Sequence, residues 1–248
     1  MILWISSRLM AAARALAAIF ILLLASLIAR AQALSVLPVN VFLQPGQKAA
    51  ALTVTNRGDT ETSIQIRAYA WNQKDNNDQL TSSNAVLVSP PLVSIAPGAV
   101  QVIRLILRSS PQGQEATYRI LIDQIPPPAE PGIVHVVLRL SIPIFAMPTI
   151  RTDPHVQFHV ECNAGQIFLV GINGGLRHEV IRDIVLSTSD GRKLKEESGA
   201  SPYILAGATR RWLITAQGPL PLPDETLQLR AHANDGTIEQ QVRVVAGP

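Results

Sequence analysis

Cysteine is almost absent from the chain, because Cys162 is the only one among 248 residues and no disulfide bond can form within the molecule. Aromatic residues are also scarce, at 4% of the sequence. No segment after the first thirty residues has the periodicity of a long amphipathic helix. Without disulfide bonds or long helices, the fold must be stabilised by a hydrophobic core between other elements. The three Trp and three Tyr residues do not favour a protein that binds carbohydrate through exposed aromatic side chains.

Motifs for catalysis are missing as well. The sequence contains neither G-x-S-x-G nor H-E-x-x-H, and Asp123 and Glu161 are acids without a recognisable partner, so no enzyme is expected. His155, His159 and Cys162 have a spacing that could suggest a metal site. On an extended strand the two histidines share one face and the cysteine lies on the other. We therefore expect no metal and no cofactor.

The first 31 residues have the pattern of a secretory signal peptide. Arg8 and Arg14 precede an apolar run over residues 16–29, and two small-x-small cleavage sites follow within residues 29–33. The alternative is an uncleaved membrane anchor, although the apolar run is short for a span. We expect residues 1–31 to be removed on export, and the mature protein to begin at Gln32 or Leu34 without stable membrane insertion.

Removal of this segment changes the charge of the chain. The full sequence has 21 Lys and Arg against 18 Asp and Glu, a net charge of +3. Residues 1–31 contain Arg8, Arg14 and Arg30 and no acid, so the mature chain has 18 basic and 18 acidic residues. A neutral chain offers no basic surface for nucleic acid, and that class of partner is excluded.

From Leu34 onward, short apolar segments alternate with turn signals such as Gln44-Pro45-Gly46 and Ala96-Pro97-Gly98. This pattern predicts an all-β protein with two immunoglobulin-like sandwich domains, over residues 34–148 and 154–248. Strands are expected at residues 35–43, 49–56, 63–71, 86–88, 100–108, 118–125 and 133–145, then at 156–160, 166–172, 181–188, 210–215, 226–233 and 238–245.

The last strand of the first domain, residues 133–145, is unusually long. At roughly 3.3 Å per residue it would extend about 40 Å. One of its faces is apolar without a break, and this face comprises Val134, Val136, Leu138, Leu140, Ile142 and Ile144. Proteins normally suppress long apolar edge strands because such strands aggregate. We therefore predict that this row is offered to a partner, and the alternative is an ordinary core strand.

Five stretches of the chain, taken in their order and spacing, carry a family resemblance. They are ALSVLPVNVFLQPGQKAAALTVTNRGD, SPPLVSIAPGAVQVIRL, YRILIDQIPPP, VVLRLSIPIF and, in the second domain, SPYILAGATRRW. They resemble the PapD-like periplasmic chaperones of the chaperone–usher pilus pathway, and in detail the archaic or spore-coat-like branch. The resemblance covers nearly the whole chain after the predicted signal peptide.

The resemblance implies a periplasmic chaperone with two immunoglobulin-like domains in a boomerang arrangement. Such a protein binds and stabilises pilus subunits and delivers them to an outer-membrane usher. The subunits lack one strand, and the chaperone lends its own by donor-strand complementation, a form of β-augmentation. The residues expected to enter the subunit are Val134, Val136, Leu138, Leu140 and Ile142. The alternative function is a secreted immunoglobulin-like adhesion or carbohydrate-binding protein.

One departure from the family concerns the grip on the subunit. Better-known chaperones of the family carry an Arg on the first strand and a Lys on the long strand, which together bind the subunit's C-terminal carboxylate. The matching positions here are Asn40 and Pro143, and neither carries a positive charge. The candidate anchors are Arg104 and Arg139, each of which interrupts an apolar strand. The alternative is that both are solvated strand arginines.

Overall fold

The structure is a computed structural model that describes residues 34–128, 131–132, 134–150, 152–163, 165–197, 199, 201–216 and 218–247. These residues form nineteen strands and no helix. Consequently, none of the described residues belongs to a helix that is long and apolar enough to cross a membrane. The predicted signal peptide, residues 1–31, lies outside the described residues.

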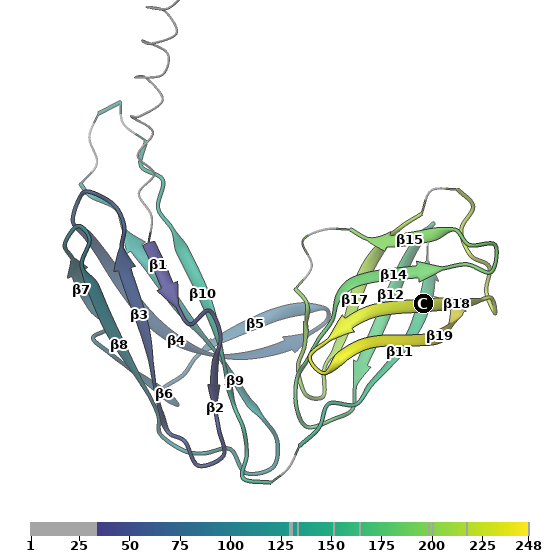
Figure 1. The fold of residues 1–248 in the computed structure, drawn as a ribbon, viewed down its shortest axis with the longest axis horizontal. Helices are drawn as coiled ribbons and strands as arrows, with labels where there is room; N and C mark the ends of the chain where they lie inside the picture. Colours follow the sequence, from purple (N-terminus) through teal and green to yellow (C-terminus); the bar gives the residue numbers. More distant parts are fainter. Residues whose placement is uncertain are drawn as a thin grey trace, which may run out of the picture.

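The N-terminal domain is a sandwich of two sheets (Figure 1). One sheet has the order β1-β3-β8-β6, with β1 at Leu34–Leu37, β3 at Ala49–Asn56, β8 at Val100–Leu107 and β6 at Val86–Ser89. The other has the order β2-β10-β9-β4-β5, with β2 at Val41–Leu43, β10 at Arg139–Ala146, β9 at Ala116–Ile125, β4 at Thr62–Lys74 and β5 at Asn77–Ser82. Strand β7, Leu92–Ile95, pairs with β4.

Alternation of side chains explains why these segments form a sandwich. In β8, Ile103, Leu105 and Leu107 point into the core, whereas Arg104 and the residues that alternate with them are exposed. Each buried aliphatic side chain contributes about 1.5–3 kcal/mol relative to an exposed one. The core between the sheets contains the buried faces of all the longer strands of the domain.

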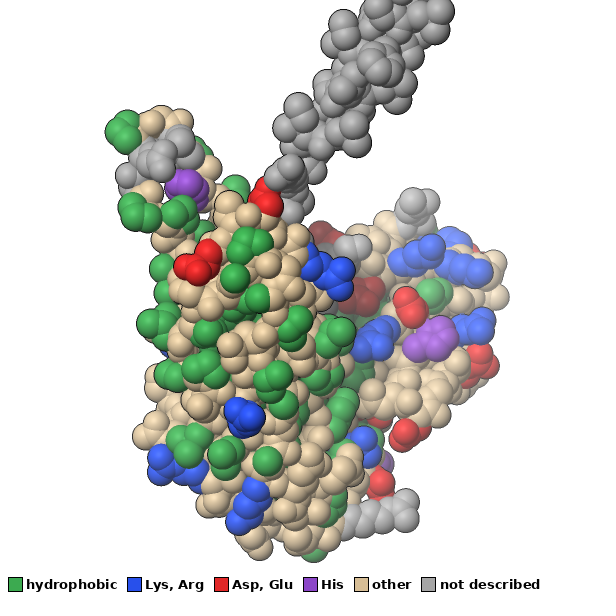
Figure 2. Space-filling model, turned by 60° about the vertical axis from the view of Figure 1, so that its left-hand side comes forward, with side chains coloured by type: hydrophobic (Ala, Val, Ile, Leu, Met, Phe, Trp, Pro, Cys, Tyr) green, Lys and Arg blue, Asp and Glu red, His purple; other side chains and the backbone are tan. Residues whose placement is uncertain are grey.

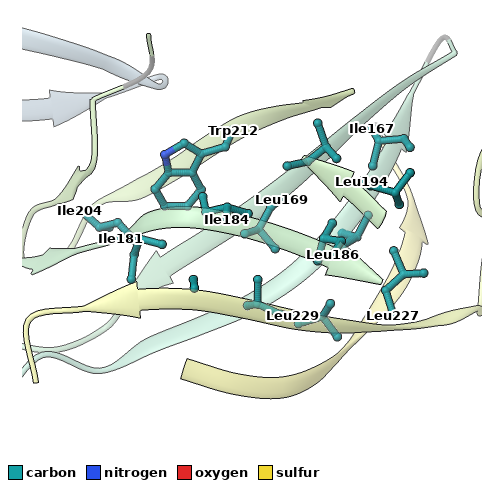
Figure 3. Packing of buried hydrophobic residues seen from close by; sticks show 14 of the residues in the cluster. Ile167, Leu169, Ile181, Ile184, Leu186, Leu194, Ile204, Trp212, Leu227 and Leu229 are labelled. Carbon is teal, nitrogen blue, oxygen red and sulfur yellow. The ribbon is translucent and has the colours of Figure 1, made fainter. Parts of the chain in front are cut away.

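The C-terminal domain closes seven strands into one circuit, β11-β12-β17-β15-β14-β18-β19. These are β11 Val156–Asn163, β12 Gln166–Asn173, β17 Thr209–Thr215, β15 Lys193–Glu196, β14 Arg182–Ser187, β18 Thr226–Ala233 and β19 Gly236–Ala246. A small sheet pairs β13, Glu179–Val180, with β16, Tyr203–Ile204. Figure 3 shows the core, with Trp212 near Ile204 at one end. A Cβ at Gly171 would lie 2.8 Å from the Ile204 side chain, so this glycine permits the close packing there.

Several strands differ from those that the sequence predicted. The segment expected as one strand at 35–43 is divided between β1 and β2, which lie in different sheets, and Pro38 stands between them. Proline cannot donate a backbone hydrogen bond and marks such breaks. Strand β4 continues to Lys74, beyond the expected end at 71, and forms a hairpin with β5. Strand β5 was missed because all six of its residues are exposed, which leaves no alternation to detect.

The two domains meet at an aromatic contact. Trp71 and Phe145 of the N-terminal domain belong to the buried cluster of the C-terminal domain. The Phe145 ring stacks on His178, with centroids 3.6 Å apart. Glu115 Oε2 accepts hydrogen bonds from the backbone N–H of His178 at 2.9 Å and from its Nδ1 at 2.7 Å. Because Phe145 lies near the end of β10, this contact fixes the base of that strand between the domains.

Candidate functional site

Strand β10 has one fully paired side and one side that is mostly open. It runs antiparallel to β9 along its whole length, from Arg139 opposite Asp123 to Ala146 opposite Ala116. On its other side it pairs with β2 only at residues 144–146. Residues 139–143 therefore form a sheet edge, and this is where Pro143 is tolerated. An open edge is a template on which another chain can add a strand.

The apolar row of residues 134–144 is divided between solvent and core. Val134 is 90% exposed, Val136 82% and Leu138 37%, whereas Leu140 is half-buried against the core. Ile142 is 6% exposed and Ile144 is fully buried, and both pack inside their own domain. The structure thus corrects the prediction at Ile142, whose side chain belongs to the N-terminal core.

The predicted strand 133–145 is also too long, because β10 begins at Arg139. Its partner β9 ends at Ile125, and Pro126, Pro127 and Pro128 follow, which cannot donate backbone hydrogen bonds. Pairing between these strands ends with the bond from Gln124 N–H to the Leu138 carbonyl, 2.9 Å long. Residues 134–138 consequently extend beyond the sheet.

Hydrophobic side chains gather on this extension. In Figure 2 the projection at the upper left of the N-terminal domain shows exposed hydrophobic groups beside the residues drawn in grey. Below it lies an open depression of about 520 Å³, lined by residues 60–63, 124–128 and 135–137. The end of the β9–β10 connection therefore combines exposed apolar side chains with a concave flank.

Arg139 lies at the start of β10 in a three-membered ionic cluster. Its side chain is 64% exposed and bonds Asp123, which also accepts a 2.6 Å bond from Arg67. Burial disfavours the ionised form of Asp123, but hydrogen bonds from both arginines outweigh this effect, and the pKa of Asp123 lies below its ordinary value. Two guanidinium groups share one carboxylate, so the cluster carries one surplus positive charge.

Arg104 lies on the opposite outer face of the sandwich. It is exposed on β8, opposite Ala51 of β3 and Ser89 of β6. Around it lie exposed apolar side chains, among them Val102 and Ile106. The structure therefore does not bring the two candidate anchors, Arg104 and Arg139, together.

A third arginine, which was not predicted from the sequence, lies next to a position where the family carries a basic residue, Pro143 in this chain. Arg119 of β9 is opposite Pro143 in the strand register. Its guanidinium lies 3.7 Å from the centre of the Trp71 ring and 5.4 Å from that of Tyr203, whose hydroxyl bonds Asn40 Oδ1 at 3.3 Å. Burial lowers the pKa of Arg119, with the nearby Asp78 acting in the other direction. In the sequence, the feature that could have identified Arg119 is its position inside the apolar run YRILI.

The histidines and the cysteine considered for metal binding lie at or near β11. His159 bonds Glu161 at 3.1 Å, and the Cys162 thiol points to the Pro221 carbonyl at 3.6 Å. Burial raises the pKa of the Cys162 thiol. In the part of the chain that the structure describes, no three His, Cys, Asp or Glu side chains are grouped so that they could hold a metal ion.

Comparison with known proteins identifies relatives for both the sequence and the fold. Residues 33–150 match the family described as pili and flagellar-assembly chaperone, PapD N-terminal domain. The chaperone protein PapD of Escherichia coli is 26% identical over 139 residues, which cover 54% of this chain and 54% of that protein. The match thus spans about half the length of this relative.

Solved structures match over most of the chain. The complex of the CsuC chaperone with the CsuE tip adhesion subunit, from archaic Csu pili of Acinetobacter baumannii, gives a TM-score of 0.64 at 21% identity, covering 87% of this chain and 100% of that one. The Salmonella enterica SafA pilin–SafB chaperone complex gives 0.58 at 16% identity, covering 87% and 97%. These likenesses confirm the predicted fold, two immunoglobulin-like β-sandwich domains in a boomerang arrangement.

Proposed function

Because residues 33–150 match the family described as pili and flagellar-assembly chaperone, PapD N-terminal domain, we propose that the chain is a PapD-like chaperone that binds and stabilises pilus subunits in the periplasm by donor-strand complementation. We further propose that it delivers these subunits to an outer-membrane usher. The single observation that carries the proposal is the apolar row that leaves the sheet at Leu138 and stays exposed to Val134. An exposed apolar row beside an open strand edge fits β-augmentation of a partner that lacks a strand.

The proposed contact uses residues 134–140 as the donated segment. Val134, Val136, Leu138 and Leu140 would enter the open core of the subunit, while Ile142 remains in the chaperone's own core. Four such side chains would contribute on the order of 6–12 kcal/mol before the costs of association and ordering. Because Ile144 and Phe145 hold the base of the strand, the row is presented in one register. A slip of one residue would turn every apolar side chain away from its pocket.

Co-expression with the pilus subunits of the same organism tests this function. The tagged mature protein is expected to co-purify with a subunit at a ratio of one to one and to keep it soluble. Recovery of the subunit only as an aggregate, with the protein itself folded and abundant, would contradict the proposal.

For the subunit's terminal carboxylate, we propose Arg139 as the anchor in preference to Arg104. Arg139 lies on the strand that continues into the donated segment, and its ionic cluster with Arg67 has a surplus positive charge. An arginine fork makes a directional, charge-assisted contact with a carboxylate. Arg104 lies on the far face of the sandwich from this strand.

Replacement of Arg139 by alanine is expected to weaken subunit binding by about 2–5 kcal/mol, as when one partner of a buried charge pair is removed. Arg104→Ala and Arg57→Ala are the controls, because Arg104 lies on the other face and Arg57 lies in an exposed turn. Binding is measured by titration of the purified chaperone against a subunit. Arg139→Ala binding as tightly as Arg57→Ala would show that the anchor lies elsewhere.

Export by an N-terminal signal peptide is the remaining part of the proposal. The pattern of residues 1–31 predicts cleavage before Gln32 or Leu34. N-terminal sequencing of the protein from a periplasmic extract is expected to start at one of these residues. Recovery of a membrane-bound protein that still begins at Met1 would contradict this prediction.

A further inference from the structure

The β4–β5 hairpin buries almost nothing within its own domain. Strand β4 continues past the sheet to Lys74, and a turn with positive φ at Asp75 (51°) and Asn76 (63°) leads into β5. Such a two-residue turn fits the twist of a hairpin. All six residues of β5 are exposed. Packing within the N-terminal domain therefore does not explain why the hairpin extends so far.

The end of the hairpin bonds the other domain. Figure 1 shows it reaching from the N-terminal domain to the C-terminal one. The Gln73 side chain donates from Nε2 to the Tyr203 carbonyl at 2.9 Å, and its Oε1 accepts from the Leu205 N–H at 3.0 Å. At the turn, Asn76 offers its carbonyl to Arg210 at 2.9 Å and its Oδ1 to the Arg211 N–H at 2.7 Å. Two residues of the hairpin thus make four hydrogen bonds across the domain boundary, three through their side chains and one through the backbone carbonyl of Asn76.

The receiving residues are themselves held in place. Arg211 forms an ion pair with Glu161, 2.5 Å long, and its guanidinium lies 4.7 Å from the centre of the Phe168 ring. Arg210 is 3.6 Å from Asp78 of β5. Asp78 is also 3.8 Å from Arg119, the partly buried arginine opposite Pro143. The hairpin therefore connects the C-terminal domain to the sheet that contains β10.

Two separated contacts are needed to fix the angle between two rigid bodies. The aromatic contact of Phe145 and His178 forms the first, and by itself it would permit the domains to rock about it. The hairpin forms the second. We propose that the β4–β5 hairpin is a strut that fixes the angle between the domains, with Gln73 and Asn76 as its positioning residues. This angle determines which surface of the C-terminal domain faces the open edge of β10.

The strut can be loosened without unfolding either domain. Open depressions of about 530 and 230 Å³ flank the hairpin where it meets the C-terminal domain, so water reaches both sides of the contact. Gln73→Ala removes its two side-chain bonds to the C-terminal domain, together with the bond from Nε2 to Asp78 within the hairpin. Asn76→Gly removes the Oδ1 contact while glycine keeps the positive φ. Gln79→Ala, an exposed change on strand β5 of the same hairpin, is the matched control.

Distances between spin labels at Ala51→Cys and Gln228→Cys, exposed positions of the two domains, measure the angle in a Cys162→Ser background. The Gln73→Ala/Asn76→Gly variant is expected to broaden the distance distribution at least about twofold, and each single change to broaden it less. Gln79→Ala should leave it unchanged. If the double variant had the wild-type distribution of label distances and the wild-type melting temperature, the proposal that the hairpin fixes the angle would be wrong.

A consequence for capture of a subunit rests on the proposed function. The double variant is expected to bind a subunit about tenfold more weakly than the Gln79→Ala control. Equal binding despite a broadened distribution would show that capture does not require a fixed angle. Failure of the wild-type protein to bind any subunit would overturn the proposed function instead, and would leave the strut intact because the label distances need no partner.

Discussion

Replacement of Val136 by aspartate is expected to abolish capture of a subunit and to leave the stability of the free protein nearly unchanged. The Val136 side chain is 82% exposed, so in the free protein the new carboxylate stays in water. In the proposed complex the same group would enter an apolar pocket without a partner, and burial of an unpaired charge costs several kcal/mol. Binding and folding should therefore respond very differently to this change.

The adjacent residue supplies the matched control. Val137 is also exposed, but in an extended segment its side chain points away from that of Val136. Val137→Asp should therefore retain much of the binding that Val136→Asp loses, as measured by co-purification and by thermal melting of the free proteins. Equal loss of binding in both variants would show that any added charge on the segment weakens binding, and that the apolar row has no specific role in it.

Replacement of Ile142 by aspartate is expected to unfold the N-terminal domain. Ile142 is on the same row as Val136 but packs in the core between the sheets. The change removes about 1.5–3 kcal/mol of apolar burial and adds a charge with no water beside it. We expect a loss of at least about 4 kcal/mol in the free energy of unfolding, a value typical of charges placed in a core.

Urea unfolding of Ile142→Asp and of Ser141→Asp measures this effect. Ser141 is the exposed neighbour on the same strand, so its variant should keep the wild-type stability. Leu140→Asp is expected to fall between them, because Leu140 is partly buried against the core. Equal stability of the variants at 141 and 142 would mean that the base of the row is not core.

The sequence was sufficient to predict most strands and the two-domain fold. Alternation of apolar residues located β3, β8 and β12 to within a residue or two, since these strands have one face in a core. The same signal could not show where β10 begins. The apolar row continues through Val134 although the partner strand β9 has already ended. The three prolines after Ile125 were the available signal for that end.

Contacts between distant parts of the chain were beyond prediction. Gln73 and Tyr203 are 130 residues apart in sequence, and Glu115 and His178 are 63 apart. Polar residues of this kind have no periodic pattern, because their partners are set by how the domains meet. Arg119 was missed for the same reason. Its neighbours Asp78 and Tyr203 come from a strand without alternation and from the other domain.

Hydrogen exchange of the backbone amides tests the central claim most directly, with the protein compared alone and in complex with a subunit. If the protein lends its strand, the amides of residues 134–137, and those of residues 139–141 that point away from β9, should exchange fast in the free protein and slow by at least about a hundredfold in the complex. Slow exchange confined to other residues of the protein, with these amides still fast in a stable complex, would contradict donation of this strand.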